Sequence, residues 1–235
     1  AETAVAWDSD TYAIQANLRE AKADLDSQVE GIAKAVEASS IKLALSCPTD
    51  ENYRKDVWPT YKAPRTDPGR RSAKPLLYRA MRQHCRERWN AVEKPRMEAD
   101  DVLGIMQTRG GATLDTVICS IDKDMMTIPG MHYDWRQSHV GVFEISKLEA
   151  RRAFYTQCLT GDSTDNYPGC PGIGVTRAAK LLEPCESQSE FWAVIVEAYR
   201  RKKLDEDYAI AQARCARILR ACDYDFETKS VKLWT

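Results

Sequence analysis

Short apolar segments alternate with longer helical stretches along this chain of 235 residues. The segments TAVAWD (3–8), IKLALS (41–46) and TVICSID (116–122) have the length and composition of buried strands. Apolar residues at helical spacing predict helices over 12–39, 76–89, 97–108, 147–160, 187–203 and 206–222, with a last strand over 231–234. Strands separated by helices indicate an α/β domain with a mainly parallel central sheet flanked by helices.

Acidic residues follow the predicted strands. Asp8 and Asp122 each end a strand, and Asp50 comes shortly after the IKLALS segment. In open α/β sheets the functional site lies at the carboxyl ends of the strands, so we expect these acids to converge. Asp124 faces the same side as Asp122 on an extended backbone. Three-residue spacing places two further pairs on shared faces, with Asp100 beside the first: Glu98 with Asp101, and Asp162 with Asp165.

Carboxylates crowded together repel one another, and several would have to hold protons. Bound Mg²⁺ or Mn²⁺ would remove this conflict, because hard cations prefer oxygen ligands. Two such ions about 4 Å apart can activate a water and stabilise the leaving oxygen of a phosphodiester. The alternative is that each acid simply faces solvent at the end of its strand or helix.

The charge is distributed unevenly. The formal net charge is −1, yet residues 62–96 hold eleven Lys and Arg against Asp67, Glu87 and Glu93, a local charge of +8. We interpret near-neutrality as a basic stretch balanced by an acidic remainder. The stretch is either a solvated surface or a contact for a polyanion.

The sequence predicts a protein of the cell interior. No apolar run is long enough for a membrane helix, and the acidic start AETAVAWDSD lacks a signal-peptide core. Ala1 could follow a removed initiator Met. The eight cysteines include no C-x-x-C pair, so we expect reduced, mostly buried thiols rather than a zinc site or disulfides.

The segment GCPGIGVTRAAKLL (169–182) opens directly into a helix. Its glycines let backbone N–H groups approach a phosphate, and the helix N-terminus favours an anion. It is neither a Walker loop nor a dinucleotide fingerprint. It fits a helix–hairpin–helix type of turn that grips the DNA backbone without reading sequence, or else an ordinary loop.

Four motifs together resemble the 5′-nuclease family, which includes flap endonucleases, the 5′ domain of bacterial DNA polymerase I and phage 5′→3′ exonucleases. They are YKAPR (61–65), MEADDVLG (97–104), SIDKDMMTI (120–128) and GDSTDNYPGCPGIGVTRAAKLL (161–182). They occur in the family's order and span most of the chain. NYRKDVWPTYKAPR, TIPGM and the ending ARILRACDYDFETKSVKLW are most similar to exonucleases of short-tailed coliphage relatives.

This resemblance implies a PIN-like or Rossmann-like fold. Residues 1–150 would form the α/β nuclease core with a basic helical arch at about 62–96. Residues 151–235 would form a helix–hairpin–helix type DNA-binding region with C-terminal helices that complete the core. The implied activity is metal-dependent 5′→3′ exonuclease action on duplex DNA, with action on flaps and RNA–DNA hybrids as variants. The implied setting is a monomer in the cytoplasm of a phage-infected bacterium, acting in DNA replication and degradation.

The resemblance also assigns residues. The metal ligands would be Asp8, Asp50, Glu98, Asp100, Asp101, Asp122, Asp124, Asp162 and Asp165, holding two Mg²⁺ ions, or Mn²⁺ in their place. Asp8, Lys62, Arg65 and Asp122 would be catalytic, with the two cations on the scissile phosphate. DNA contacts would come from Arg54, Lys62, Arg65, Arg70, Arg71, Lys74, Gly172, Gly174, Thr176 and Arg177, with K⁺ at the glycine hairpin. Tyr61, Tyr78 and Trp89 could stack on bases or belong to the core.

Two positions depart from the family pattern. Asp8 is followed by Ser9 instead of Gly, and Asp10 lies close by. Cys47 stands nearest to the Asp that the family has after its second strand, which makes Asp50 the weakest member of the ligand set. Alternatives are a flap endonuclease, a PIN-type ribonuclease and a DNA-structure-binding module without activity.

Overall fold

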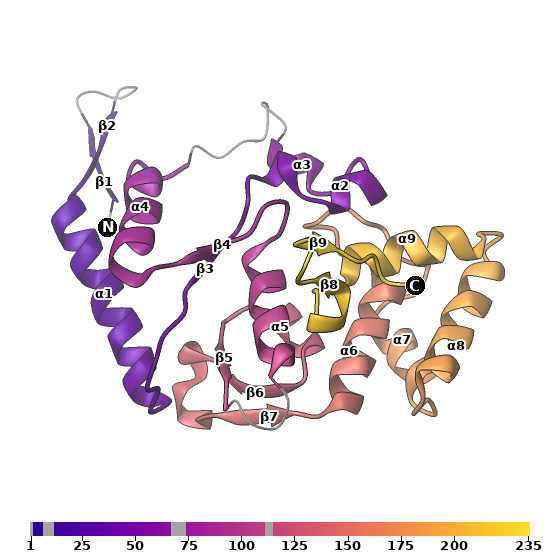
Figure 1. Ribbon diagram of the computed structural model, residues 1–235. Helices are drawn as coiled ribbons and strands as arrows, with labels where there is room; N and C mark the ends of the chain where they lie inside the picture. Colours follow the sequence, from indigo (N-terminus) through magenta and orange to yellow (C-terminus); the bar gives the residue numbers. More distant parts are fainter. Residues whose placement is uncertain (1, 7–11, 67–73, 111–114) are drawn as a thin grey trace.

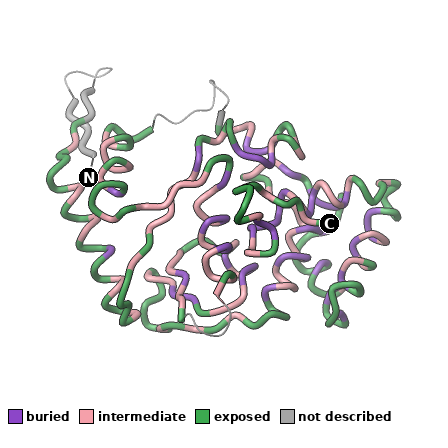
Figure 2. The backbone as a smooth tube through the Cα atoms, in the orientation of Figure 1, coloured by how far each residue is buried: buried purple, intermediate pink, exposed green. Residues whose placement is uncertain are grey.

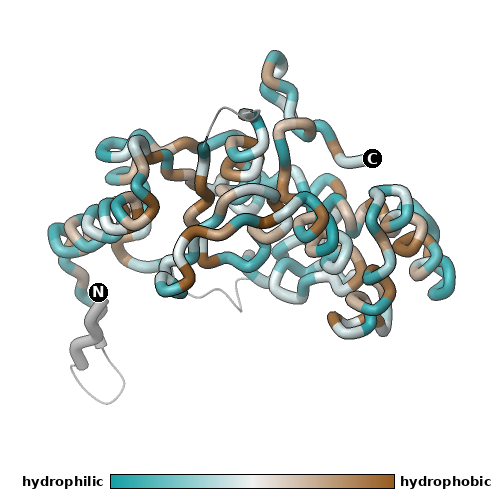
Figure 3. The backbone as a smooth tube through the Cα atoms, turned by 90° about the horizontal axis from the view of Figure 1, so that it is seen from below, coloured by the Kyte–Doolittle hydropathy of each residue, from teal (hydrophilic) through white to brown (hydrophobic). Residues whose placement is uncertain are grey.

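The computed structural model describes residues 2–6, 12–66, 74–110 and 115–235. Figure 1 shows an elongated arrangement, with α1 and α4 at one end, α5 and α6 in the middle and α7 to α9 at the other end. Hydrophobic and hydrophilic residues are interspersed along the helices when the molecule is viewed from below (Figure 3). Among the described helices, none has the length and apolar character needed to cross a membrane.

The chain begins with a hairpin. Strands β1 (Glu2–Ala6) and β2 (Tyr12–Ala16) pair antiparallel, and helix α1 (Leu18–Ala35) follows. The helix predicted from residue 12 therefore begins later, because the Asn17 side chain accepts hydrogen bonds from the N–H groups of Arg19 and Glu20 and caps it at that point. The first strand was expected in the central sheet, but in the described part of the chain it pairs with β2 instead. Pairing with the next strand closes only a short loop.

The middle of the chain carries short elements. They are β3 (Ala44–Leu45), the 3-10 helix η1 (Thr49–Glu51), α2 (Arg54–Val57), α3 (Ala63–Thr66), α4 (Tyr78–Trp89), β4 (Val92–Glu93) and α5 (Ala99–Arg109). Strands β3 and β4 are parallel. Helix α4 packs on α1, where the Asp26 carboxylate accepts a hydrogen bond from Trp89 Nε1 (2.7 Å) and contacts His84 Nε2 (2.8 Å). This contact holds the basic helix against the N-terminal end of the molecule.

The three-stranded sheet of the described chain is mixed and has the order β5-β6-β7. Strands β5 (Val117–Cys119) and β6 (Gly130–Tyr133) are parallel, with the 3-10 helix η2 (Lys123–Thr127) between them. Strand β7 (Phe143–Ile145) follows the 3-10 helix η3 (Trp135–Val140) and is antiparallel to β6. The predicted parallel pairing is therefore present in two short pieces, while a tight connection makes β7 antiparallel.

The C-terminal half is helical. Helices α6 (Lys147–Thr160), α7 (Val175–Leu182), α8 (Gln188–Arg200) and α9 (Glu206–Ala216) pack around α6. Tyr155 stacks on Phe191 at 5.0 Å between ring centres, and Tyr199 donates a hydrogen bond to the carbonyl of Cys158. In Figure 2 the buried backbone concentrates in these helices and in α5, whereas α1 buries only Val29. The largest core cluster of the described chain therefore lies between α6 and helices α7, α8 and α9, and α5 contributes to a smaller one.

The chain then returns to α5 through η4 (Ala221–Asp223), β8 (Tyr224–Asp225) and β9 (Ser230–Val231). The helix predicted to reach residue 222 ends at Ala216, because the carbonyls of Cys215 and Arg217 accept hydrogen bonds from a buried arginine. Gly104 in α5 allows this approach, since a Cβ there would lie 2.4 Å from the carbonyl oxygen of Leu219. The eight cysteines are free, and all except Cys119 and Cys222 are buried.

Candidate active site

The first turn of α5 presents two carboxylates. Glu98 is the N-cap residue and Asp100 lies in the first turn, where the helix dipole favours negative charge. Burial alone would raise the pKa of Glu98, but the charges of Arg54 and Lys62 outweigh it and hold that pKa below its usual value. Burial raises the pKa of Asp100 to about 7, helped by the negative charges of Asp122 and Glu98. The Asp100 carboxyl therefore lies close to several other negatively charged side chains.

A second carboxylate group begins η2, directly after β5. Asp122 caps this 3-10 helix and accepts a hydrogen bond from the N–H of Asp124 (2.9 Å). The Asp124 carboxylate in turn accepts one from Gln157 Nε2 on α6 (2.6 Å). Burial, together with the charges of Asp122 and Asp162, raises the pKa of Asp124 to about 6. The two groups on α5 and η2 therefore share one electrostatic environment with the loop after α6.

The third group lies in that loop. Asp162 Oδ1 accepts hydrogen bonds from the N–H groups of Thr164 and Asp165, and the Asp162 backbone pairs with that of Tyr167. The loop closes tightly because Gly161 and Gly169 touch, and a Cβ on Gly169 would lie 2.2 Å from the Gly161 nitrogen. Both glycines have positive φ, which a residue with a side chain adopts only with strain.

Tyr61 and Lys62 join the first and third groups. The Tyr61 hydroxyl lies 3.0 Å from Glu98 Oε2 and 2.9 Å from Asp165 Oδ2. Lys62 Nζ contacts Glu98 Oε1 and lies 3.3 Å from Asp165 Oδ2, while its backbone N–H donates to the carbonyl of Asp165. Half-exposed Arg65 pairs with Asp165 Oδ1 at 2.8 Å. The predicted catalytic cations thus lie among the predicted metal carboxylates, although residues 62 and 165 are far apart in sequence.

Two predicted site residues, Arg54 and Asp101, are buried and bind each other. Asp101 is fully buried, and both of its oxygens are bound by the guanidinium of Arg54, at 2.7 and 2.8 Å. Its oxygens also accept hydrogen bonds from the N–H groups of Glu98 and Leu219, which leaves no free lone pair for a metal. Arg54 is only 2% exposed, so in the described structure its side chain is not available to contact DNA. Motif spacing does not reveal burial of this kind.

The position after the second predicted strand (41–46) has two candidate residues, Cys47 and Asp50. Asp50 is exposed in η1 and, within the described residues, makes no hydrogen bond or ion pair with the carboxylate groups. Cys47 is buried nearby, and burial together with the charges of Glu98 and Glu51 raises the pKa of its thiol to about 11. A neutral, buried thiol therefore lies within the electrostatic influence of Glu98 at this position. Asp8, Arg70 and Arg71 lie outside the described residues.

The predicted DNA-contacting surface is partly exposed. Lys74 is exposed and its Nζ lies 4.6 Å from the centre of the Tyr78 ring. Exposed positions also follow the third carboxylate group: Gly172 with φ of 77°, the N-cap residue Gly174, Thr176 and Arg177. Ile173, Ala178 and Leu182 anchor this segment in the core. Its assignment as a helix–hairpin–helix stays a prediction.

For Tyr61, the structure selects the core alternative over base stacking, and one polar residue of the site was not predicted. Tyr61 is 1% exposed and binds carboxylates, so it is not available to stack on a base. Trp89 donates its indole N–H to Asp26. Gln157 was not singled out, and its contact with Asp124 has no local sequence signal because α6 and η2 meet only in the folded chain.

No three Asp, Glu, His or Cys side chains of the described chain are arranged to hold a metal ion as they stand. Glu98 and Asp165 are directed to Lys62, Tyr61 and Arg65 instead. The donor chemistry nevertheless suits a hard cation, because Asp100 and Asp124 have raised pKa values caused by burial and by neighbouring carboxylates. Fold and acid distribution together define a candidate hydrolase site.

Residues 12–154 match the family model described as the 5′-3′ exonuclease N-terminal resolvase-like domain. The exodeoxyribonuclease of Enterobacteria phage T3 is 30% identical over 216 residues, covering 78% of this chain and 70% of that protein. The flap endonuclease Xni of Shewanella oneidensis is 27% identical over 171 residues, covering 68% of this chain and 65% of that protein. The chain belongs to the 5′-3′ exonuclease family and is a nuclease.

The fold is shared with a solved structure. The bacteriophage T5 flap endonuclease, solved as a complex with DNA and metal ions, superposes with a TM-score of 0.60 at 14% identity. The match covers 82% of this chain and 79% of that protein. At this identity the comparison supports the fold: a resolvase-like 5′-3′ exonuclease architecture of helices and mixed sheets.

Proposed function

We propose that this nuclease is a metal-dependent 5′→3′ exonuclease that hydrolyses phosphodiesters at the 5′ ends of duplex DNA with two divalent ions. One observation carries the proposal. Carboxylates from α5 and from the loop after α6 meet at Tyr61 and Lys62, and the charges of the η2 carboxylates act on both groups.

The ions would be Mg²⁺, with Mn²⁺ as a substitute. The residues that would hold them are Glu98, Asp100, Asp122, Asp124, Asp162, Asp165 and Asp8, with Asp101 excluded by its hydrogen bonds. When bound, the ions supply an activated water and stabilise charge on the leaving oxygen. Their positive charge would also relieve the repulsion that raises the pKa of Asp100 and Asp124.

The chain supplies cations of its own beside these carboxylates. Lys62 is buried between Glu98 and Asp165, and Arg65 pairs with Asp165 at the solvent edge. A phosphodiester reaching the carboxylates would meet both cations, which favour the negative charge that develops during hydrolysis. Arg65, with 47% of its side chain exposed, is the more accessible of the two.

The duplex would be held by the exposed backbone at Gly172 and Gly174 with Thr176 and Arg177, and we propose K⁺ as the ion bound there. The similarity to the phage T3 exodeoxyribonuclease supports a role in phage DNA degradation, and we propose DNA replication and the removal of RNA from RNA–DNA hybrids as further parts of that role. We further propose a monomer working in the cytoplasm of the infected bacterium. The similarity to Xni favours flap cleavage as a second candidate activity.

A substrate panel tests the proposal. The EDTA-treated protein is given Mg²⁺ with blunt duplex, nicked duplex, 5′-flap and RNA–DNA hybrid, each labelled at either end. We expect short products released from 5′ ends and none in EDTA. Release from 3′ ends, or cleavage that persists in EDTA, would contradict it. Cutting only at the flap junction would select the second candidate.

Variants link this activity to the carboxylates. Asp122→Ala and Asp162→Ala should abolish cleavage and leave duplex binding largely intact, as measured by electrophoretic mobility shift. Asp134→Ala is a matched control, because Asp134 caps the 3-10 helix η3 as Asp122 caps η2, accepting a hydrogen bond from the N–H of Arg136. Cleavage retained by both Asp122→Ala and Asp162→Ala would refute the two-metal assignment.

A further inference from the structure

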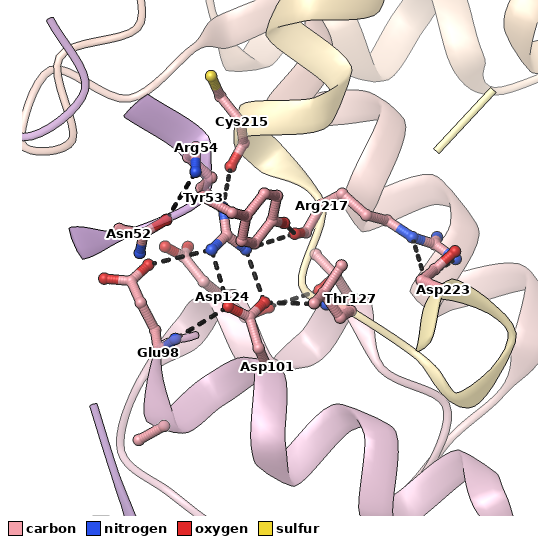
Figure 4. Close-up of polar contacts among 12 residues, drawn as sticks. Asn52, Tyr53, Arg54, Glu98, Asp101, Asp124, Thr127, Cys215, Arg217 and Asp223 are labelled. Atoms are coloured by element: carbon pink, nitrogen blue, oxygen red, sulfur yellow. Dashed lines mark hydrogen bonds and ion pairs between the residues drawn. The ribbon is translucent and has the colours of Figure 1, made fainter. Parts of the chain in front are cut away.

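Arg54 lies at the start of α2 and is enclosed by protein (Figure 4). Its guanidinium has five N–H groups, and each has an acceptor. The two terminal nitrogens bind the two oxygens of Asp101 at 2.7 and 2.8 Å, and one of them also lies 3.4 Å from Glu98 Oε2. The remaining donors reach the carbonyls of Cys215 (3.1 Å) and Arg217 (2.5 Å). All the guanidinium donors of Arg54 are therefore used in contacts within the protein.

This arrangement fixes Glu98 in two ways. Asp101 accepts a hydrogen bond from the Glu98 N–H (3.0 Å), which holds the backbone at the N-cap of α5. Arg54 contacts the Glu98 carboxylate directly, and together with Lys62 it keeps the pKa of that group low against the effect of burial. Glu98 is thus held in a defined direction at the edge of the carboxylate groups by contacts to both its backbone and its side chain.

Arg54 and Asp101 also bind backbone groups near the C-terminal end of the chain. The carbonyls of Cys215 and Arg217 receive the Arg54 donors, and the N–H of Leu219 donates to Asp101. Lysine could not replace these contacts, because an ammonium has three donors and no planar fork. The Arg54–Asp101 pair thus ties the first turn of α5 to the segment 215–219, which begins in the last turn of α9.

We propose that Arg54 is a positioning residue for the metal centre: with Asp101 and the segment 215–219, it orients Glu98 for metal binding. This inference rests on the proposed role of Glu98 as a metal ligand. Residues that orient metal ligands change metal affinity or activity on the order of 10- to 100-fold when they are altered.

The test measures metal binding without substrate. The Mn²⁺ affinity of the full chain is determined by electron paramagnetic resonance of the free ion, and the Mg²⁺ dependence of cleavage is determined in parallel. Arg54→Lys should weaken Mn²⁺ binding on the order of tenfold and shift the Mg²⁺ dependence to higher concentration, with activity partly rescued at saturating Mg²⁺. Circular dichroism establishes that the variant is folded.

A second variant keeps the test decisive if Arg54→Lys does not fold. R54M/D101L replaces the buried ion pair with apolar side chains, which a fold often tolerates better than a single unpaired charge. We expect the same weakening of Mn²⁺ binding. The matched control is Arg152→Met, which removes another arginine whose guanidinium donates to two backbone carbonyls, those of Glu183 (3.1 Å) and Cys185 (3.3 Å), outside this arrangement. It should keep Mn²⁺ affinity within about twofold of the wild type.

The outcomes are distinct. Wild-type Mn²⁺ affinity in folded Arg54→Lys or R54M/D101L would overturn the inference, as would equal losses in Arg152→Met. If the wild-type protein bound no Mn²⁺ and needed no Mg²⁺, the proposed function would fail and not the positioning role alone. If Glu98→Gln left Mn²⁺ affinity intact while Arg54→Lys weakened it, the Arg54 effect would not run through Glu98, and the inference would again be refuted.

Discussion

Asp100 is expected to destabilise the metal-free protein at alkaline pH, so its replacement by asparagine should stabilise the fold while removing activity. Its carboxyl is partly buried at the first turn of α5, and the charges of Asp122 and Glu98 act on it. Its pKa rises from 3.8 to about 7. The folded protein therefore holds this proton more tightly than the unfolded chain does. The stabilisation that results is complete below pH 4 and is lost as the pH rises through about 7.

The size of the effect follows from the pKa. One pKa unit corresponds to about 1.4 kcal/mol, so ionising Asp100 in the folded protein costs at most about 4 kcal/mol at pH 8. Water reaches part of this side chain and screens the neighbouring charges, so we expect about 2 kcal/mol. Asparagine has the same shape and no charge, so it should avoid this cost.

The assay is urea unfolding in EDTA at pH 4 and pH 8. Asp100→Asn should match the wild type closely at pH 4 and exceed its free energy of unfolding by about 2 kcal/mol at pH 8, with the difference growing between these two pH values. Added Mg²⁺ should stabilise the wild type and not the variant, because a ligand stabilises only the state that binds it. Asp134→Asn, at the surface cap of η3, should show no such gain. A variant less stable than the wild type at pH 8, or a difference independent of pH, would refute the reasoning.

Three further predictions concern chemistry, packing and DNA binding. Lys62→Ala should lower kcat on the order of 100-fold with a much smaller change in duplex Kd, and equal losses would make Lys62 a plain phosphate contact. Gly169→Ala should destabilise the fold by about 3 kcal/mol or more in thermal melts, because its Cβ would collide with the Gly161 nitrogen. Its control, Gly31→Ala on the open face of α1, should be neutral or stabilise the fold by up to about 1 kcal/mol. Duplex affinity should fall at least about tenfold between 50 and 200 mM salt in fluorescence anisotropy, and a flat response would contradict a multi-phosphate contact.

Much of the site was predictable because its motifs are local. Glu98 and Asp100 lie in the first turn of a helix and Asp122 follows a strand, as apolar periodicity indicated. Lys62 reaches the carboxylates, as the YKAPR motif implied. The parallel pairing of β3 with β4 and of β5 with β6 follows from strands separated by long connections. The β1–β2 hairpin was not predicted, because helical periodicity in residues 12–16 concealed a short strand.

Tertiary structure alone decided the roles of Arg54 and Asp101. Spacing placed both among the functional residues, and the EADD motif cannot distinguish Asp100 from Asp101. In the folded chain they become a buried ion pair, because donors and acceptors arrive from residues 215–219, more than a hundred positions away. A sequence determines which face of its helix a carboxylate occupies. Whether the lone pairs of that carboxylate are already taken depends on segments that only folding brings together.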